Sequence, residues 1–563
     1  MPIPPEMIHR GAEILTLFRD IRIFEVFLTR WFEVCDGITI IRPIYGVWIR
    51  GIQQEFDAIL SQHERVEDLY GLSELVWRNT QHSITVDGTT STLEWGARHT
   101  GRHLRWETLG ALCSAVGLIA IDMSEYDSAF NSARAKGIAK DKRTMTETIR
   151  KAIEEVLAFC RYCETTTDVY VCNLYESVLL LESLRGDAYS GAWHRMGEVV
   201  DTVISLGYHQ EKRADVNTPF YIAELRTRLF DQIYGHDKNI STFLGRPPRL
   251  SHRYCVTQLP LDLSDEELCL QGAELQTAIS RLNDGWNSDN RFRRSTWRRV
   301  WAQHARIRED ILEIVLGTSV EGMATKAEKI RGRIRQTNDS MPEFVKADVI
   351  EILNNMHSDV HPLVSQWERE RIPLNTMNLV WIHGGIIHTE FLLERSLVNR
   401  LKSSDVSALI PKARALLTVI LAAVSKRDQM RDFTIDMIAL LVAYGLPAAG
   451  VIGVEMLKQE QTREYTPDIL PRSKVIQDLS VFVSALATVS PGEGNYTICD
   501  QGRKVLEKIL DKILSPQPHQ PATGIPHNDL GNDTSLYFPT GNDAEFMQWL
   551  DNLEWERGSL FNQ

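Results

Sequence analysis

The spacing of apolar residues constrains the fold of this 563-residue chain more than any other feature. Between Trp193 and Gly207, apolar side chains recur at steps of three and four, and the glycine stands where a helix would end. Similar stretches cover about residues 14–34, 103–121, 146–184, 221–234, 297–316, 376–400, 405–425, 433–444 and 470–487. Period-two alternation, typical of half-buried strands, occurs only over 38–41 and 83–86. The pattern predicts an all-α fold, a large array of paired antiparallel helices.

Composition limits the function of such an array. The net charge is −13, whereas a protein that grips a phosphate backbone normally carries a basic surplus. We therefore expect no direct DNA contact from this chain. Eight cysteines are scattered over nearly the full length, which indicates reduced thiols and an intracellular setting. The uncharged run from Met437 to Val454 is long enough for a membrane span, but Pro447 and several glycines interrupt it. We expect a buried helix, a turn and a second buried helix there, and no membrane association.

The chain changes character near its C-terminus. From Ser515 it is rich in Pro, Gly, Asn and His and poor in large apolar residues, which predicts a flexible linker over 515–542. Residues 543–563 then alternate acidic and large apolar side chains, which predicts a short acidic helix. Its apolar residues are Phe546, Trp549, Leu550, Leu553 and Trp555. Such a segment suits an activation segment that enters a coactivator groove, or a helix that docks back onto its own core.

Motifs for catalysis are missing from the sequence. There is no G-x-S-x-G elbow, no Walker loop and no G-x-G-x-x-G after a strand, so we expect no enzyme, no catalytic residue and no bound cofactor. The pairs His99/His103 and His357/His361 lack the further ligands of a zinc site, and we expect no metal. Cys160 and Cys163 form a lone C-x-x-C within a helical stretch and are interpreted as small packed thiols.

A basic cluster, RFRRSTWRR, occupies residues 291–299. It mixes arginines with Phe292 and Trp297, as nucleic-acid surfaces do. A helix with a solvated cationic face has the same composition and is much more common. We therefore expect this segment to expose its arginines to solvent.

The stretch from Leu184 to Leu259 resembles the middle homology region of fungal zinc binuclear cluster transcription factors. The resemblance rests on LRGDAYSGAWHRMGEVVDTVISLGYHQ, ELRTRLFDQIYGHDKNISTFLGRPPRLS and CVTQLPLDL. The matching positions are Gly186, Trp193, Gly197, Leu206, Gly207, His209, Glu224, Leu225, Arg226, Arg228, Asp237, Gly245, Arg246, Pro247 and Pro248. Thr227 and Phe230 depart from the family pattern, and weaker similarity extends from about residue 20 to 450.

The family's six-cysteine zinc cluster has no counterpart in this chain, so none of its zinc ligands or DNA contacts can be assigned here. A zinc-cluster exon upstream of Met1 is the alternative. With this resemblance we divide the helical array into 1–90, a middle homology region over 91–300, and 301–514. The resemblance implies a nuclear transcriptional regulator that contacts coactivators or the transcription machinery, and control of a pathway-specific gene cluster is a further expectation from the family. A homodimer, a DNA-binding partner and a small-molecule effector are further expectations.

One part of the matching region has a physical interpretation of its own. Glu224 and Arg228 stand one helical turn apart, a spacing that permits an ion pair, and Arg226 lies between them. Asp237 is expected to pair with Arg246, beside Gly245, which allows a sharp corner. Pro247 and Pro248 would stop the helix. We predict a structural clamp that holds the loop after this helix on the core. The alternative function is a non-enzymatic helical scaffold that binds a metabolite or a protein, with no role in transcription.

Overall fold

The computed structural model describes residues 2–62, 65–135, 140–210, 217–355 and 372–515. Over these residues the fold is all-α, as predicted, and no β-strand is present; only two isolated bridges occur. The two strand predictions, 38–41 and 83–86, were wrong, because both segments are irregular connections between helices. The backbone of residues 38–41 accepts a hydrogen bond from a side chain: Arg298 Nη2 donates to the Ile38 carbonyl at 2.6 Å.

The helices of the N-terminal half surround a central buried helix. They are α1 (Pro5–Leu15), α2 (Ile21–Val34), α3 (Arg42–Gln62), α4 (Tyr70–Gln81), α5 (Thr92–Ala97), α6 (Trp106–Asp122), α7 (Ser128–Ala135), α8 (Lys142–Tyr162), α9 (Asp168–Arg185), α10 (Ser190–Ser205), α11 (Phe220–Leu244) and α12 (Gly272–Ser280).

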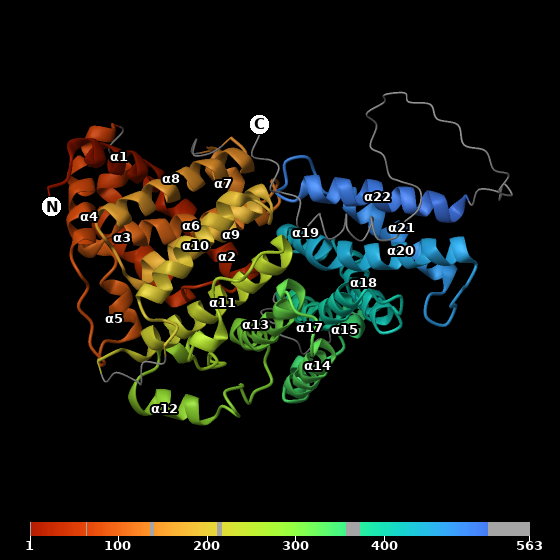
Figure 1. The fold of residues 1–563 in the computed structure, drawn as a ribbon. Coiled ribbons are helices and arrows are strands. Elements are labelled where there is room, and N and C mark those ends of the chain that lie inside the picture. Colours follow the sequence, from red (N-terminus) through yellow and green to blue (C-terminus); the bar gives the residue numbers. More distant parts are fainter. Residues whose placement is uncertain (1, 63–64, 136–139, 211–216, 356–371, 516–563) are drawn as a thin grey trace.

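The remaining helices form the second half. They are α13 (Arg294–Leu316), α14 (Met323–Asp339), α15 (Val349–Asn355), α17 (Ile372–Leu401), α18 (Leu409–Val424), α19 (Thr434–Leu440), α20 (Leu446–Thr462), α21 (Arg472–Leu486) and α22 (Tyr496–Leu514). In Figure 1 the red-to-yellow helices gather on one side and the blue-green helices on the other, with α11 and α13 where they meet. The contacts run in sequence across this junction: α11 packs on α13, α13 on α17, α17 on α18 and α18 on α20.

Helix α6 is buried along nearly its whole length because small residues let its neighbours approach closely. A methyl group added at Gly110 would lie 2.2 Å from Asn173 Nδ2 of α9, and one at Gly117 would lie 2.9 Å from Ile149 Cγ2 of α8. Ser114 Oγ donates to Asn173 Oδ1 at 2.7 Å, which satisfies two polar groups in this apolar contact. The helix is therefore the axis of the N-terminal half.

The structure corrects two predicted boundaries. The periodic stretch 146–184 is two helices, α8 and α9, separated by a turn in which Glu164 has φ 53°. The uncharged run at 437–454 contains no chain-reversing turn. Instead α19 continues through a π-helical turn (Leu441–Gly445) directly into α20, and this turn lies just before Pro447, which has no N–H to donate.

The helical segment Thr434–Thr462 is, among the described residues, the one that length and composition would allow to cross a membrane. Its most apolar stretch is 83% buried within the protein. Packing against α18 and α22 accounts for that burial. The segment therefore behaves as a core helix, as the sequence predicts.

The expectation for the basic cluster at 291–299 was wrong for its last two arginines, whereas Arg291 is exposed as expected. Arg298 and Arg299 are 6% and 4% exposed, and their guanidinium groups donate to main-chain carbonyls of neighbouring loops. Arg299 Nη1, for example, donates to the Pro260 carbonyl at 2.7 Å. These arginines hold loops in place instead of facing solvent.

Candidate effector cavity and arginine corner

The first part of the predicted clamp is an ion pair within α11. Arg228 Nε donates to Glu224 Oε1 at 2.9 Å, and both side chains are buried. The Glu224 carboxylate also accepts from the Leu261 amide at 2.9 Å, and Arg228 Nη2 donates to the carbonyls of Leu261 and Leu263. The pair therefore fixes the loop after the arginine corner to α11.

Arg226 points to a different helix. Its Nε and Nη2 donate to the two carboxylate oxygens of Asp168, at 2.7 and 3.0 Å. Asp168 is the first residue of α9, where a negative charge is also favoured by the helix dipole. The Tyr208 hydroxyl donates to the same carboxylate. Arg226 thus joins α11 to the start of α9.

The predicted pair between Asp237 and Arg246 is replaced by another arrangement. Asp237 accepts from Lys238 Nζ at 2.8 Å and from the amides of Arg249 and Leu250 at 3.1 and 3.0 Å. Lys238 is fully buried, and its ammonium group lies 4.1 Å from the centroid of the Tyr234 ring. Lys238 is the next residue in the sequence and pairs with Asp237 directly. The same carboxylate also accepts from the amides of the loop after α11.

The corner itself docks on α10 through an aromatic ring. The guanidinium carbons of Arg246 and Arg249 lie 4.6 and 3.7 Å from the centroid of the Trp193 ring. Gly245 ends α11 with φ 60°, the left-handed conformation that favours glycine. Pro247 and Pro248 follow in irregular backbone outside the helix. The backbone of the corner is therefore as the sequence predicts. Arg246 stacks on Trp193 instead of forming the expected ion pair with Asp237.

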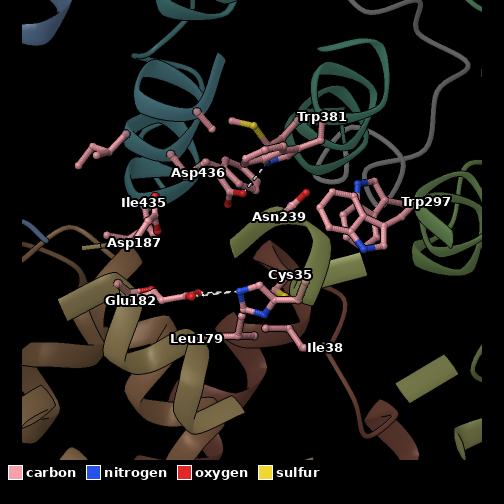
Figure 2. Close-up of a pocket in the computed structure, with 18 of the residues that line it drawn as sticks. Cys35, Ile38, Leu179, Glu182, Asp187, Asn239, Trp297, Trp381, Ile435 and Asp436 are labelled. Carbon is pink, nitrogen blue, oxygen red and sulfur yellow. Dashed lines mark hydrogen bonds and ion pairs between the residues drawn. The ribbon is translucent and has the colours of Figure 1, made fainter. Parts of the chain in front are cut away.

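A cavity of about 340 Å³ lies where the two halves of the protein meet (Figure 2). Ligand sites in proteins commonly have volumes from about 300 Å³ upward and form between structural units. Its walls come from α2, α6, α9, α11, α13, α17 and α19. The aromatic residues that line it are Trp31, Tyr175, Phe243, Trp297, Trp301, Trp381, Phe433 and Tyr444.

Acidic groups line the part of the cavity formed by α6, α9 and α19. Trp381 Nε1 donates to Asp436 Oδ1 at 2.6 Å, and the two side chains lie beside each other in Figure 2. The Ile435 amide donates to Asp122 Oδ1 at 2.9 Å. Burial, reinforced by the charge of Asp436, raises the pKa of Asp122 well above its usual value, and burial also raises the pKa of Asp436. Both carboxyl groups of this wall therefore hold a proton more readily than exposed carboxyl groups do.

A second polar contact on the same side joins α9 to α11. His236 Nε2 lies 2.9 Å from Glu182 Oε2, the contact drawn at the lower left of Figure 2. Burial lowers the pKa of His236, but the adjacent Glu182 carboxylate outweighs it and the pKa is raised overall. The contact with Glu182 therefore favours the protonated form of His236.

Arginines and a neutral histidine line the part formed by α13 and α17. Arg308 Nη1 donates to Asn239 Oδ1, and its Nη2 lies 3.4 Å from His388 Nδ1. Burial, together with the charges of Arg308 and Arg395, lowers the pKa of His388 well below its usual value. His388 therefore stays neutral and accepts from Arg308.

The cysteine of the cavity wall is poorly suited to nucleophilic attack. Cys35, the cysteine that lines it, has its pKa raised to about 12 by burial, which leaves the thiol protonated and weakly nucleophilic. Among the described residues, no three His, Cys, Asp or Glu side chains cluster as a metal would require. His99 is buried and contacts the Trp95 carbonyl at 2.8 Å, whereas His357 and His361 lie outside the described residues.

Sequence reasoning found the corner but missed the cavity. Its lining residues are separated by several hundred positions and carry no local motif. Two glycines of α17, Gly384 and Gly385, lie against Tyr444 of the cavity wall. The predicted activation segment (Phe546, Trp549, Leu550, Leu553 and Trp555) and the linker beyond Ser515 lie outside the described residues.

Comparison with curated proteins identifies partial relatives. The chain is 32% identical over 117 residues to "Pyrimidine pathway regulatory protein 1" of Saccharomyces cerevisiae, covering 19% of this chain and 13% of that protein. It is 26% identical over 163 residues to "Fusarisetin A cluster transcription factor fsa6" of a Fusarium species, covering 29% and 21%. The chain is a homologue of fungal transcription factors.

The similarity covers only a part of the length of each relative. A third, "Equisetin cluster transcription factor eqxF" of Fusarium heterosporum, is 25% identical over 163 residues, which is 29% of this chain and 23% of that protein. No family model and no solved structure matches the chain. By name, the relatives are a pathway regulatory protein and transcription factors of gene clusters.

Proposed function

We propose that this protein is a nuclear, fungal-type transcriptional regulator of a pathway-specific gene cluster. The observation that carries the proposal is the homology to named transcription factors, which include regulators of single biosynthetic clusters. The described residues fit a regulatory region: a helical array with a cavity at the junction of its halves and no assembled reaction centre. The protein would act through contacts and not through bond-making.

The regulatory output would pass through protein surfaces. The acidic and aromatic segment at 543–563 would serve as an activation segment that binds a coactivator or the transcription machinery. Direct DNA contact would come from elsewhere, through a homodimer or a DNA-binding partner, since the chain carries a net charge of −13. The clamp residues Glu224, Arg226, Arg228, Asp237, Gly245, Arg246, Pro247 and Pro248 would have an architectural role.

The cavity would receive a small-molecule effector. Its walls belong to both halves, so a ligand that fills it would favour one relative arrangement of α11, α13 and α17. Such differential binding is the requirement for a ligand to shift a conformational equilibrium. The clamp residues lie along α11 and in the corner after it, and because α11 lines the cavity they would keep that wall rigid.

A reporter assay tests the transcriptional role. The full chain is fused to an unrelated sequence-specific DNA-binding domain, and transcription from a reporter with measurable basal activity is compared with that of the DNA-binding domain alone. We expect a change in transcription, and a smaller change when residues 516–563 are deleted. An output equal to that of the DNA-binding domain alone, at equal protein level, would instead favour a helical scaffold with no role in transcription.

That scaffold is the second candidate, and the cavity is the observation that favours it. A cavity of about 340 Å³ with aromatic walls would suit metabolite binding whether or not transcription follows. Ligand binding by the purified chain with no reporter response would support this candidate.

A further inference from the structure

Arg308 is a buried cation without an acidic partner. It lies in the middle of α13, is 5% exposed, and lines the cavity. Its neighbours are neutral: Asn239 Oδ1 accepts from Nη1, and His388 Nδ1 accepts from Nη2 at 3.4 Å. Its Nε has no hydrogen-bond partner among the described residues, and no carboxylate of the described chain pairs with it.

Other buried arginines of the protein are satisfied in ways that Arg308 is not. Arg105 and Arg228 each face a buried glutamate, at 2.5 and 2.9 Å. Arg298 and Arg299 each donate to two main-chain carbonyls. A buried guanidinium without such partners is costly, because its lost hydration is not replaced. Arg308 differs from these arginines in the kind of acceptor, because its two partners are a side-chain amide and an imidazole, and its guanidinium could still accommodate an anion.

The charge around Arg308 favours an anion. Arg395 lines the same cavity, and both arginines lie close enough to His388 to hold that imidazole neutral. The walls from α6, α9 and α19 instead carry Asp122, Asp436 and the Glu182–His236 pair. A negatively charged group would thus be drawn to the α13–α17 side, where the arginines lie.

The rest of the cavity suits an apolar body. Trp297 and Trp301 stack with a centroid distance of 5.0 Å, and Trp381 lies across the cavity from α11, as the positions of Trp381, Asn239 and Trp297 in Figure 2 show. Flat aromatic walls favour flat or branched apolar molecules. A volume of about 340 Å³ accommodates a small ring system with one polar group.

We propose that the cavity binds a small organic acid, whose anionic group pairs with Arg308 and whose apolar body lies against Trp297, Trp301 and Trp381. This inference rests on the proposed effector function of the cavity and adds the chemical class of the effector. The anion would accept from the free Nε and complete the hydrogen bonds that Asn239 and His388 leave open.

Two matched fluorescent probes test the charge requirement with the purified full chain. 1-Anilinonaphthalene-8-sulfonate carries an aromatic body and one negative charge, and N-phenyl-1-naphthylamine has the same body without the charge. We expect the wild-type protein to bind the anionic probe more tightly. Arg308→Met should weaken binding of the anionic probe about tenfold or more, as loss of a charge-assisted pair implies, and leave the neutral probe unchanged. Arg427→Met, on an exposed side chain, is the control and should change neither.

The outcomes separate this inference from the proposed function. Retained binding of the neutral probe by Arg308→Met shows that the cavity is intact, so a folding defect cannot imitate the expected result. Equal affinity for both probes in the wild type, or anionic-probe binding that Arg308→Met leaves unchanged, would overturn the organic-acid assignment while leaving an effector cavity. Binding of both probes that survives filling of the cavity by Ala439→Trp would show that they bind elsewhere and overturn the assignment as well.

Discussion

Glu176 provides a sharp test of the packing described here. It lies in the centre of α9, is fully buried, and accepts one hydrogen bond, from Thr39 Oγ1 at 2.6 Å. Its second oxygen has no partner among the described residues. Burial raises the pKa of this carboxyl to about 8, against about 4.3 in an unfolded chain. The carboxyl is therefore protonated in the folded protein at neutral pH.

The sign of the pH dependence follows from this raised pKa. Between about pH 4.3 and pH 8 the folded state binds a proton that the unfolded state has lost, so the stabilisation present at low pH declines as pH rises. From pH 6.5 to 8 the loss is about 2 kcal/mol, at about 1.4 kcal/mol per pH unit. The buried His99 and His304, whose pKa values are lowered to about 4, act in the opposite direction but only below about pH 6.5.

Glu176→Gln removes this titration while keeping nearly the same shape. The glutamine oxygen can accept from Thr39, and its amide replaces the carboxyl oxygen that has no partner. We expect the free energy of unfolding, measured by urea titration, to fall less between pH 6.5 and 8 in the variant, by about 2 kcal/mol. Asp231 and Asp265, with pKa values raised to about 7 and 6, remain in both proteins and cancel in the comparison. The same pH dependence in both proteins would refute a buried, protonated Glu176.

Two further substitutions test the corner and the junction. Asp237→Ala leaves the buried Lys238 without its nearest counter-charge and should cost about 3–5 kcal/mol, whereas Arg246→Ala removes stacking on Trp193 and should cost only about 0.5–1 kcal/mol. Thermal melting of both variants checks this order, and unchanged melting of both would remove the clamp. Gly235→Ala places a methyl group 1.9 Å from Trp301 Nε1, so we expect a lower melting temperature and altered fluorescence of the cavity tryptophans; wild-type values of both would contradict the close contact of α11 and α13.

Predictions from the sequence were correct where residues close together in the chain determine the local structure. Helical periodicity identified most helices, and the four-residue spacing of Glu224 and Arg228 predicted their ion pair. Gly245 was predicted at the corner because its left-handed conformation is a local property. Local physics also explains one error: the glycines near Pro447 suggested a turn, but tertiary packing holds them in a continuous helix.

The remaining features depend on residues far apart in the chain. Arg226 pairs with Asp168 across 58 positions, which no spacing rule predicts. The choice of Lys238 over Arg246 as the partner of Asp237 depends on which side chain is buried, and only the folded chain determines that. The cavity combines side chains from residue 31 to residue 495, so the cavity and the position of Arg308 in its wall emerge only when both halves pack together.

The central claim is that this cavity controls transcription. The most direct measurement is reporter output from the full chain fused to an unrelated DNA-binding domain, compared between wild type, the cavity-filling Ala439→Trp and the surface control Arg427→Met at equal protein levels. We expect the wild type and Arg427→Met to agree, and Ala439→Trp to differ from both several-fold because the larger side chain occupies the effector site. Identical output from all three proteins, with the Ala439→Trp fold intact, would contradict the account.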